Sequence, residues 1–247
     1  MSDLQVHFLG TGDAFCSGGR FQTCFHVTDP DQNFLIDCGA TSLMALKING
    51  ISTAEIDSII ISHFHGDHFG GLPFLMIDAF FEEHRTKTLQ IVGPPGVEAR
   101  VIASLQNLYP GINAAKFSYQ LQFTEFSLSE QIRVGNLHVQ AFEVVHAPES
   151  LPHAVKIKIE DKTIAFSGDT GWVDNLPQIA SGADLFICES NFYDTEIDMH
   201  LNYLRIQEAK PDLDCGKLIL NHLGTEMLTN LEKVSLDCAH DGMKIQL

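Results

Sequence analysis

Four potential metal ligands lie close together in the sequence, directly after an apolar run. The run is Ile59–Ile61, and the ligands that follow it are His63, His65, Asp67 and His68. Alternate residues of an extended chain point to the same side, so the first two histidines can face one metal ion together. If Gly66 makes a turn into a helix, the aspartate and the last histidine can face a second ion. Imidazole and carboxylate suit divalent metals, whereas a core has no use for these groups; an exposed polar loop is the alternative.

Three further candidate ligands each follow an apolar segment that resembles a strand. His146 comes after residues 142–145, Asp169 after residues 164–168 and His222 after residues 218–221. Taken singly, a histidine is more often a packed or exposed side chain than a ligand. Strand ends that meet at one rim of a sheet are nevertheless a common scaffold for a rigid site. We therefore expect these three residues to join the first cluster.

The elements that must position these residues alternate between strands and helices. Apolar and alternating runs predict strands over Val6–Leu9, Phe34–Ile36, Ile59–Ile61, Leu89–Val92, Val139–Val145, Ala154–Ile159, Thr163–Phe166, Leu185–Cys188 and Lys217–Leu220. Apolar residues at helical spacing predict helices over 71–84 and 97–108. No repeat or linker divides the chain, so we expect one layered α/β (α+β) domain covering residues 1–247.

The charge of the chain limits its partners. The formal net charge is −17 at pH 7. Such a surface repels polyanions and offers no counterion release, so a long nucleic acid is a poor partner. Two bound divalent cations can still create one positive spot on this background, which leaves small anionic substrates open.

Cysteine usage and hydropathy indicate an intracellular location. The six cysteines are scattered singly, which favours reduced thiols. The first residues show no signal peptide, and the longest apolar stretch, around residues 74–81, is too short to cross a bilayer. We expect a cytoplasmic protein without a membrane partner.

Taken together, these motifs resemble the metallo-β-lactamase superfamily, within it the ribonuclease Z and phosphodiesterase-like branch. The signature His-x-His-x-Asp-His stands at residues 63–68, and the resemblance extends from Gly10-Thr11-Gly12 through residues 34–39 to residues 167–170 and His222. It implies an αββα four-layer sandwich with the active site at one rim. It also implies two divalent metal ions, with zinc as the default and manganese or iron as alternatives.

The resemblance assigns a role to each candidate residue. His63, His65 and His146 would hold one metal, Asp67, His68 and His222 the other, and Asp169 would bridge them.

Asp67 is counted as catalytic as well as metal-binding, and Glu189 and His200 would form a proton-donor pair. Asp37 would accept a hydrogen bond from a metal-binding histidine and so orient it. Arg20 would bind an anionic group of the substrate. Around Glu189 the family's His-Glu-Ala-Thr pattern is missing, so a structural ion pair is the alternative there.

The predicted function is that of a dinuclear phosphodiesterase with a bridging hydroxide as nucleophile. The alternatives are a tRNA 3′-processing endonuclease, an acyl-ester, lactone or thioester hydrolase, a single-iron oxidoreductase and a non-catalytic metal-binding sensor. The tRNA enzymes of the family carry a long protruding insertion that is not visible here. The last two classes usually lose ligands, whereas all seven positions are filled. We therefore expect a small phosphodiester or ester substrate, and, by similarity, a homodimer.

Overall fold

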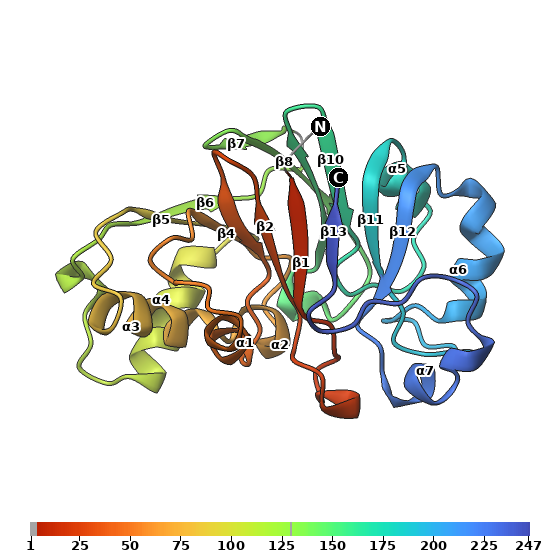
Figure 1. The fold of residues 1–247 in the computed structure, drawn as a ribbon, viewed down its shortest axis with the longest axis horizontal. Helices are drawn as coiled ribbons and strands as arrows, with labels where there is room; N and C mark the ends of the chain where they lie inside the picture. The colour runs from red at the N-terminus through yellow and green to blue at the C-terminus, as the bar shows by residue number, and fades with distance from the viewer. Residues whose placement is uncertain (1–3, 129) are drawn as a thin grey trace.

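The computed structural model describes residues 4–128 and 130–247; residues 1–3, on which part of the signal-peptide prediction rests, lie outside this range. The described residues form two β-sheets that pack face to face with helices on both outer sides (Figure 1). The αββα sandwich expected from the sequence is confirmed. The first and last strands are neighbours: β1 (Gln5–Gly10) pairs with β13 (Lys244–Gln246).

The first sheet has seven strands and the second has six. In spatial order the first is β13, β1, β2 (Cys24–Thr28), β3 (Asn33–Ile36), β4 (Ser58–Ile60), β5 (Leu89–Gly93) and β6 (Leu121–Glu125). The second is β12 (Cys215–Asn221), β11 (Ala183–Glu189), β10 (Lys162–Phe166), β9 (His153–Ile159), β8 (Leu137–Glu143) and β7 (Ile132–Val134).

The central core lies between the two sheets and is formed by the side chains on the inner faces of their strands. Ile60 points into this core, whereas its neighbours Ile59 and Ile61 pack into the layer of helices on the other side. Both faces of β4 are therefore buried, which explains why its sequence is a continuous apolar run and not an alternating one.

Helices cover the outer faces of the two sheets (Figure 1). Those beside the first sheet are α1 (Ser42–Ile48), α2 (Gly66–Phe69), α3 (Leu72–Phe81) and α4 (Val97–Leu108). Those beside the second are α5 (Leu176–Ala180), α6 (Tyr203–Ala209) and α7 (Thr225–Thr229). Short 3-10 turns are η1 (Ser17–Gly19), η2 (Ala114–Lys116), η3 (Pro148–Ser150), η4 (Lys210–Asp212) and η5 (Leu231–Lys233). In the part of the chain that is described, no helix is long and apolar enough to cross a membrane.

Several predicted boundaries differ from the structure. The strand predicted to run to Val145 ends at Glu143, and the backbone N–H of Val145 turns to the hydroxyl of Thr170. The helix predicted over 71–84 ends at Phe81, and the left-handed φ of 48° at His84 does not continue a helix.

Some strands were not predicted at all. β2 carries His26, whose ring bonds to the side chain of Asn33 at 2.7 Å, so a polar residue sits in a buried strand. The edge strand β6 is only partly buried, and its alternation is short: Leu121 and Phe123 with Gln122 and Thr124.

The cysteines were expected to be buried, reduced thiols. The structure pairs none of the six, and only Cys24, Cys38 and Cys188 are buried, whereas Cys16, Cys215 and Cys238 are partly exposed.

Candidate metal centre

The predicted ligands come from strand ends that meet at one rim of the sandwich. His63 and His65 follow β4, and Asp67 and His68 lie in α2. β8, β10 and β12 run in the same direction, and each is followed within a few residues by His146, Asp169 or His222. The expected turn into a helix after His65 is present as α2, which begins at Gly66. The structure thus brings all seven predicted ligands together.

The first ligand group consists of three histidines. His63, His65 and His146 each offer a ring nitrogen, and these atoms lie within 4.8 Å of one another. The nitrogen of His65 that faces the group is Nδ1, which lies 3.0 Å from Nε2 of His146. Three imidazoles around one point are a donor set suited to zinc and similar divalent ions.

The second ligand group combines imidazoles with carboxylates. Asp67, His68, Asp169 and His222 offer donor atoms within 4.8 Å of one another. Oδ2 of Asp67 lies 3.3 Å from Nε2 of His68 and 3.2 Å from Nε2 of His222. The side chains of all four residues are buried, so their polar atoms need partners within the cluster or a bound ion.

Asp169 lies between the two groups. Its Oδ1 is 3.2 Å from Nε2 of His68, and its Oδ2 is 3.3 Å from Nε2 of His222. The same Oδ2 is 3.9 Å from Nε2 of both His63 and His146. A carboxylate in contact with both groups has the position that a bridging ligand requires.

One buried carboxylate, Asp37, orients a histidine in each group. Its Oδ2 accepts from Nδ1 of His68 at 2.6 Å. Ser62 donates its backbone N–H and its hydroxyl to Asp37 at 2.7 and 2.8 Å, and Nδ1 of His63 lies 3.0 Å from that hydroxyl. With Nδ1 of both rings engaged in this way, their Nε2 atoms are turned toward the ligand cluster.

The donor set fits divalent cations. Nε2 of His63, Nε2 of His68 and Oδ1 of Asp169 are buried, no hydrogen bond satisfies them, and the last two lie only 3.2 Å apart. At metal–ligand distances of about 2.0–2.1 Å, the donors of a tetrahedral site lie about 3.3 Å apart. Many of the separations between these atoms are close to that value. Lone pairs that face one another across such a gap need a cation between them.

The pKa values of the ligands agree with this. Burial lowers the pKa of His63, His65 and His146, which keeps their rings neutral and their lone pairs free. His68 differs: burial opposes the shift, but the neighbouring carboxylates, Asp169 foremost, raise its pKa. The second group therefore holds positive charge strongly, as a proton in the bare chain or as a metal ion.

Two contacts that sequence reasoning missed hold the outer nitrogens of other ligands. Nδ1 of His146 donates to the backbone carbonyl of Met199 at 2.8 Å. Nδ1 of His222 lies 3.1 Å from the side-chain amide of Asn191. Neither partner carries a signal in the sequence, because one is a backbone atom and the other is a common loop residue.

Glu189 and His200 form the predicted pair. Glu189 ends β11 and is fully buried, and Nδ1 of His200 lies 3.0 and 3.2 Å from its two carboxylate oxygens. Burial works against the shift, but this carboxylate raises the pKa of His200 to about 9. The ring is therefore protonated at neutral pH. It also lies close to the ligands, with its centroid 4.7 Å from that of His146.

Arg20 does not lie among the ligands. Its Nη1 donates to the hydroxyl of Thr11 at 3.0 Å and to the carbonyl of Ala239 at 2.6 Å. These contacts fasten the loop after β1 to the carboxy-terminal segment. Contact between Arg20 and a substrate stays a prediction.

Two site residues have an unusual backbone conformation. Asp37 and His222 have φ values of 57° and 59°, in the left-handed region that costs a non-glycine residue of the order of 1 kcal/mol. Gly168, beside Asp169, has a φ of 59°, and a Cβ there would lie 2.5 Å from the carbonyl of His153. The packing around these positions must therefore maintain conformations that cost free energy.

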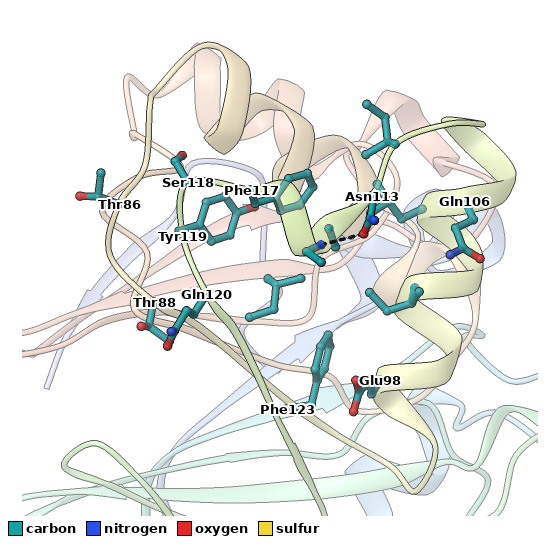
Figure 2. Close-up of a pocket in the computed structure, with 16 residues that line it drawn as sticks. Thr86, Thr88, Glu98, Gln106, Asn113, Phe117, Ser118, Tyr119, Gln120 and Phe123 are labelled. Carbon is teal, nitrogen blue, oxygen red and sulfur yellow. Dashed lines mark hydrogen bonds between the residues drawn. The ribbon is translucent and has the colours of Figure 1, made fainter.

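A cavity of about 350 Å³ opens onto the cluster. It is lined by five of the ligands together with His200 and several apolar residues. A larger cavity of about 770 Å³ lies elsewhere, beside α4 and the segment 112–123, and Figure 2 shows that its lining includes Glu98, Asn113 and Tyr119. None of the predicted site residues lines it, whereas five of the predicted metal ligands line the smaller cavity.

Comparison with protein families identifies the chain. Residues 4–236 match the family described as "Anti-Pycsar protein Apyc1". This chain belongs to that family. Among curated proteins, the ribonuclease Z of Agathobacter rectalis is 27% identical in an alignment that covers 78% of this chain and 77% of that protein.

Solved structures share the fold of this family member. The metallo-β-lactamase fold protein YhfI from Bacillus subtilis matches with a TM-score of 0.81 and 22% identity, over 98% of this chain and 99% of that one. The short form of human tRNase Z (ELAC1) matches with a TM-score of 0.79 and 20% identity, over 98% of each chain. The resemblance predicted from the sequence is confirmed: the chain has the metallo-β-lactamase fold and is similar to the ribonuclease Z branch.

Proposed function

We propose that this protein is a metal-dependent hydrolase of the metallo-β-lactamase fold and, more specifically, a dinuclear phosphodiesterase. The observation that carries the proposal is the meeting of seven donor residues from four separate segments in two adjoining groups, with Asp169 in contact with both. A mononuclear oxidoreductase or a ligand-poor sensor would not need the second group.

The residues of each group have separate tasks. His63, His65 and His146 would hold one ion, Asp67, His68 and His222 the other, and Asp169 both. Two divalent ions bound there supply Lewis acidity and lower the pKa of a coordinated water from 15.7 toward about 7. Zinc is the first choice for these donors, with manganese or iron as alternatives.

His200 would protonate the leaving group. Its ring lines the same cavity as the ligands, and Glu189 holds Nδ1, so Nε2 is the atom free to donate. In the metal-free chain the pKa of about 9 keeps the proton on the ring at neutral pH. A departing alkoxide is a strong base and gains most from such a donor.

The proposed substrate is a small phosphodiester. The net charge of −17 repels long polyanions, whereas a bound pair of cations attracts one phosphate. The cavity of about 350 Å³ lies at the lower end of the ~300–1,000 Å³ range of small-molecule sites. Homodimerisation stays a prediction, which the mass in solution tests.

A second candidate is tRNA 3′ processing. Curated relatives named ribonuclease Z, such as that of Agathobacter rectalis, favour it. The acidic surface opposes it, because tRNA binding depends on contacts between phosphates and cationic side chains.

A substrate panel on the zinc- or manganese-loaded protein tests the proposal. The panel holds bis-para-nitrophenyl phosphate, cyclic nucleotides, a precursor tRNA and a lactone. We expect turnover of a small phosphodiester, its loss in His146→Ala, and its retention in His138→Ala, which removes an exposed histidine from the same segment. A protein that holds two metals and cleaves only the lactone, or only the tRNA, would overturn the proposed substrate class.

A further inference from the structure

One edge of the first sheet has no neighbouring strand among the residues that the structure describes. β6 is the last strand of that sheet and pairs only with β5. Before β6, the carbonyl of Gln120 accepts from the N–H of Leu89 at 2.9 Å, and after it, the N–H of Phe126 donates to the carbonyl of Gly93 at 2.8 Å. Between these two contacts, the backbone groups of successive residues face alternate sides of the strand.

Three residues of β6 therefore turn their backbone N–H and C=O groups to the open edge: Leu121, Phe123 and Glu125. Natural sheets protect such an edge with proline, lysine or a bulge. Leu121–Glu125 contains neither proline nor lysine, and its register with β5 has no shift. Its one charged residue, Glu125, stands at the end of the strand. The edge is thus open to pairing with another strand.

The larger cavity of about 770 Å³ lies beside this edge. Ile102 and Leu105 of α4 line it together with Leu121 and Phe123 of β6. The two β6 side chains point to the same side of the sheet, because alternate residues of a strand share a side. Figure 2 shows Phe123 and Glu98 at the same end of this cavity. A strand added to β6 would direct every second side chain to the side on which the cavity lies.

One end of this surface is acidic. A neighbouring cavity of about 470 Å³ shares Glu98, Ile102 and Gln106 with the larger one and is also lined by Glu125. Among the described residues that line either cavity, none is a lysine, arginine or histidine. The carboxylate of Glu125 accepts from the backbone N–H of Gly96 at 2.8 Å, which fixes its position. Two carboxylates without a cationic neighbour in the lining favour a partner with positive charge.

We propose that β6 and α4 form a groove that binds an extended, cationic peptide by strand addition. Apolar side chains of the peptide would lie over Leu121 and Phe123, and a lysine or arginine would lie beside Glu125. Addition of a peptide to an exposed sheet edge is a recurrent mode of recognition, in which backbone hydrogen bonds supply affinity and alternate side chains supply specificity. None of the predicted metal ligands lines either cavity, so this inference does not rest on the proposed function.

The geometry of pairing sets the sequence of a probe peptide. Antiparallel pairing is the more stable kind, and it places the amino end of the peptide beside Glu125. The sequence Lys-Thr-Val-Thr-Val would then lie opposite Glu125, Thr124, Phe123, Gln122 and Leu121, in that order. Its lysine and both valines share the side of the sheet that faces the cavity. The probe carries an acetyl group at its amino end and a fluorophore at its carboxyl end.

Fluorescence anisotropy compares this peptide with two N-methylated copies. The valine opposite Phe123 would exchange two hydrogen bonds with it, so methylating the nitrogen of that valine removes a donor that faces β6. The N–H of the next threonine, opposite Gln122, points away from β6, and its methylated copy is the matched control. We expect a loss in affinity of about 5- to 150-fold for the first copy and none for the second.

A double variant, Glu98→Gln with Glu125→Gln, tests the acidic end of the groove. We expect it to weaken the peptide by about 2- to 5-fold and to leave unchanged a copy in which norleucine replaces lysine. The control is Glu160→Gln with Glu232→Gln, which makes the same change in net charge at two other exposed positions. The control should bind the peptide as the wild type does.

Three results would overturn the inference. The first is no binding of the peptide, or an equal loss for the two methylated copies, because strand addition requires the donor that faces β6. The second is an equal loss in the two double variants, which would show a general effect of net charge. Sedimentation equilibrium gives the third: a dimer that the peptide dissociates would assign the edge to a second copy of this chain.

Discussion

Neutralising Asp37 should weaken both metal sites at once. In the wild type the backbone N–H of Ser62 donates to Oδ1 of Asp37 at 2.7 Å. In Asp37→Asn the side chain keeps its shape, and its amide oxygen can still accept this hydrogen bond. The amide group that replaces Oδ2 cannot accept from Nδ1 of His68 or from the Ser62 hydroxyl, so the rings of His68 and His63 both lose their support.

The expected magnitude follows from the strength of such contacts. Removing the partner that orients a metal-bound histidine costs about 10- to 100-fold in metal affinity. That corresponds to about 1.4–2.7 kcal/mol. Because Asp37 contacts His68 directly and His63 through Ser62, we expect a loss at each of two binding steps, with the larger one at the group that contains His68.

Competition titration against a chromophoric chelator measures both steps. Ser62→Ala is an informative companion, because it cuts only the branch to His63 and should weaken one step. Asp78→Asn is the matched control: it neutralises another buried carboxylate, which bonds to Thr53 and Lys47 and not to a ligand. A folded Asp37→Asn variant that binds two zinc ions with wild-type affinity would refute the reasoning.

Three other perturbations have defined outcomes. His200→Ala should slow cleavage of phosphodiesters with poor leaving groups far more than of those with good ones, by about 10²–10⁴-fold for the former, and equal losses in a leaving-group series would contradict its role as proton donor. The hydrogen bonds to Glu226 lower its pKa from 4.5 to about 2, although burial opposes this, so its contribution to stability is complete above about pH 4.5 and is lost as the pH falls toward 2. The difference in unfolding free energy between wild type and Glu226→Gln should shrink over that range in chemical denaturation, and a constant difference would refute the shift. Gly168→Ala should lower the melting temperature by an amount that corresponds to about 1–3 kcal/mol, because it adds a Cβ 2.5 Å from the carbonyl of His153 at a left-handed φ; an unchanged thermal transition would show that the backbone there is free to move.

The ligand positions could be predicted from the sequence because ligand chemistry is specific. Few arrangements other than a metal site place His63, His65, Asp67 and His68 behind a buried strand. The strand ends before Asp169 and His222 were also visible as apolar runs, and the structure brings these residues to the same rim.

What supports the ligands could not be predicted. Ser62 and Asn191 are ordinary residue types, and their contacts with His63 and His222 depend on the tertiary fold. The carbonyl of Met199 that holds His146 is a backbone atom and leaves no trace in residue identity. Likewise, a phenylalanine such as Phe15 reads as a core residue until its exposure is known.

Strands were missed where burial and polarity disagree. β2 buries His26 because Asn33 satisfies its ring, which hides the strand from a hydrophobicity pattern. β6 is an edge strand whose residues are mostly half-exposed, so only Leu121 and Phe123, alternating with Gln122 and Thr124, mark it, and this pattern is short.

Anomalous diffraction at the zinc edge, from crystals of the zinc-loaded protein, tests the central claim most directly. We predict two anomalous peaks per chain, one among His63, His65 and His146 and one among Asp67, His68 and His222, with Asp169 in contact with both. No peak among these residues, or a single peak that leaves either group without an ion, would contradict the dinuclear site.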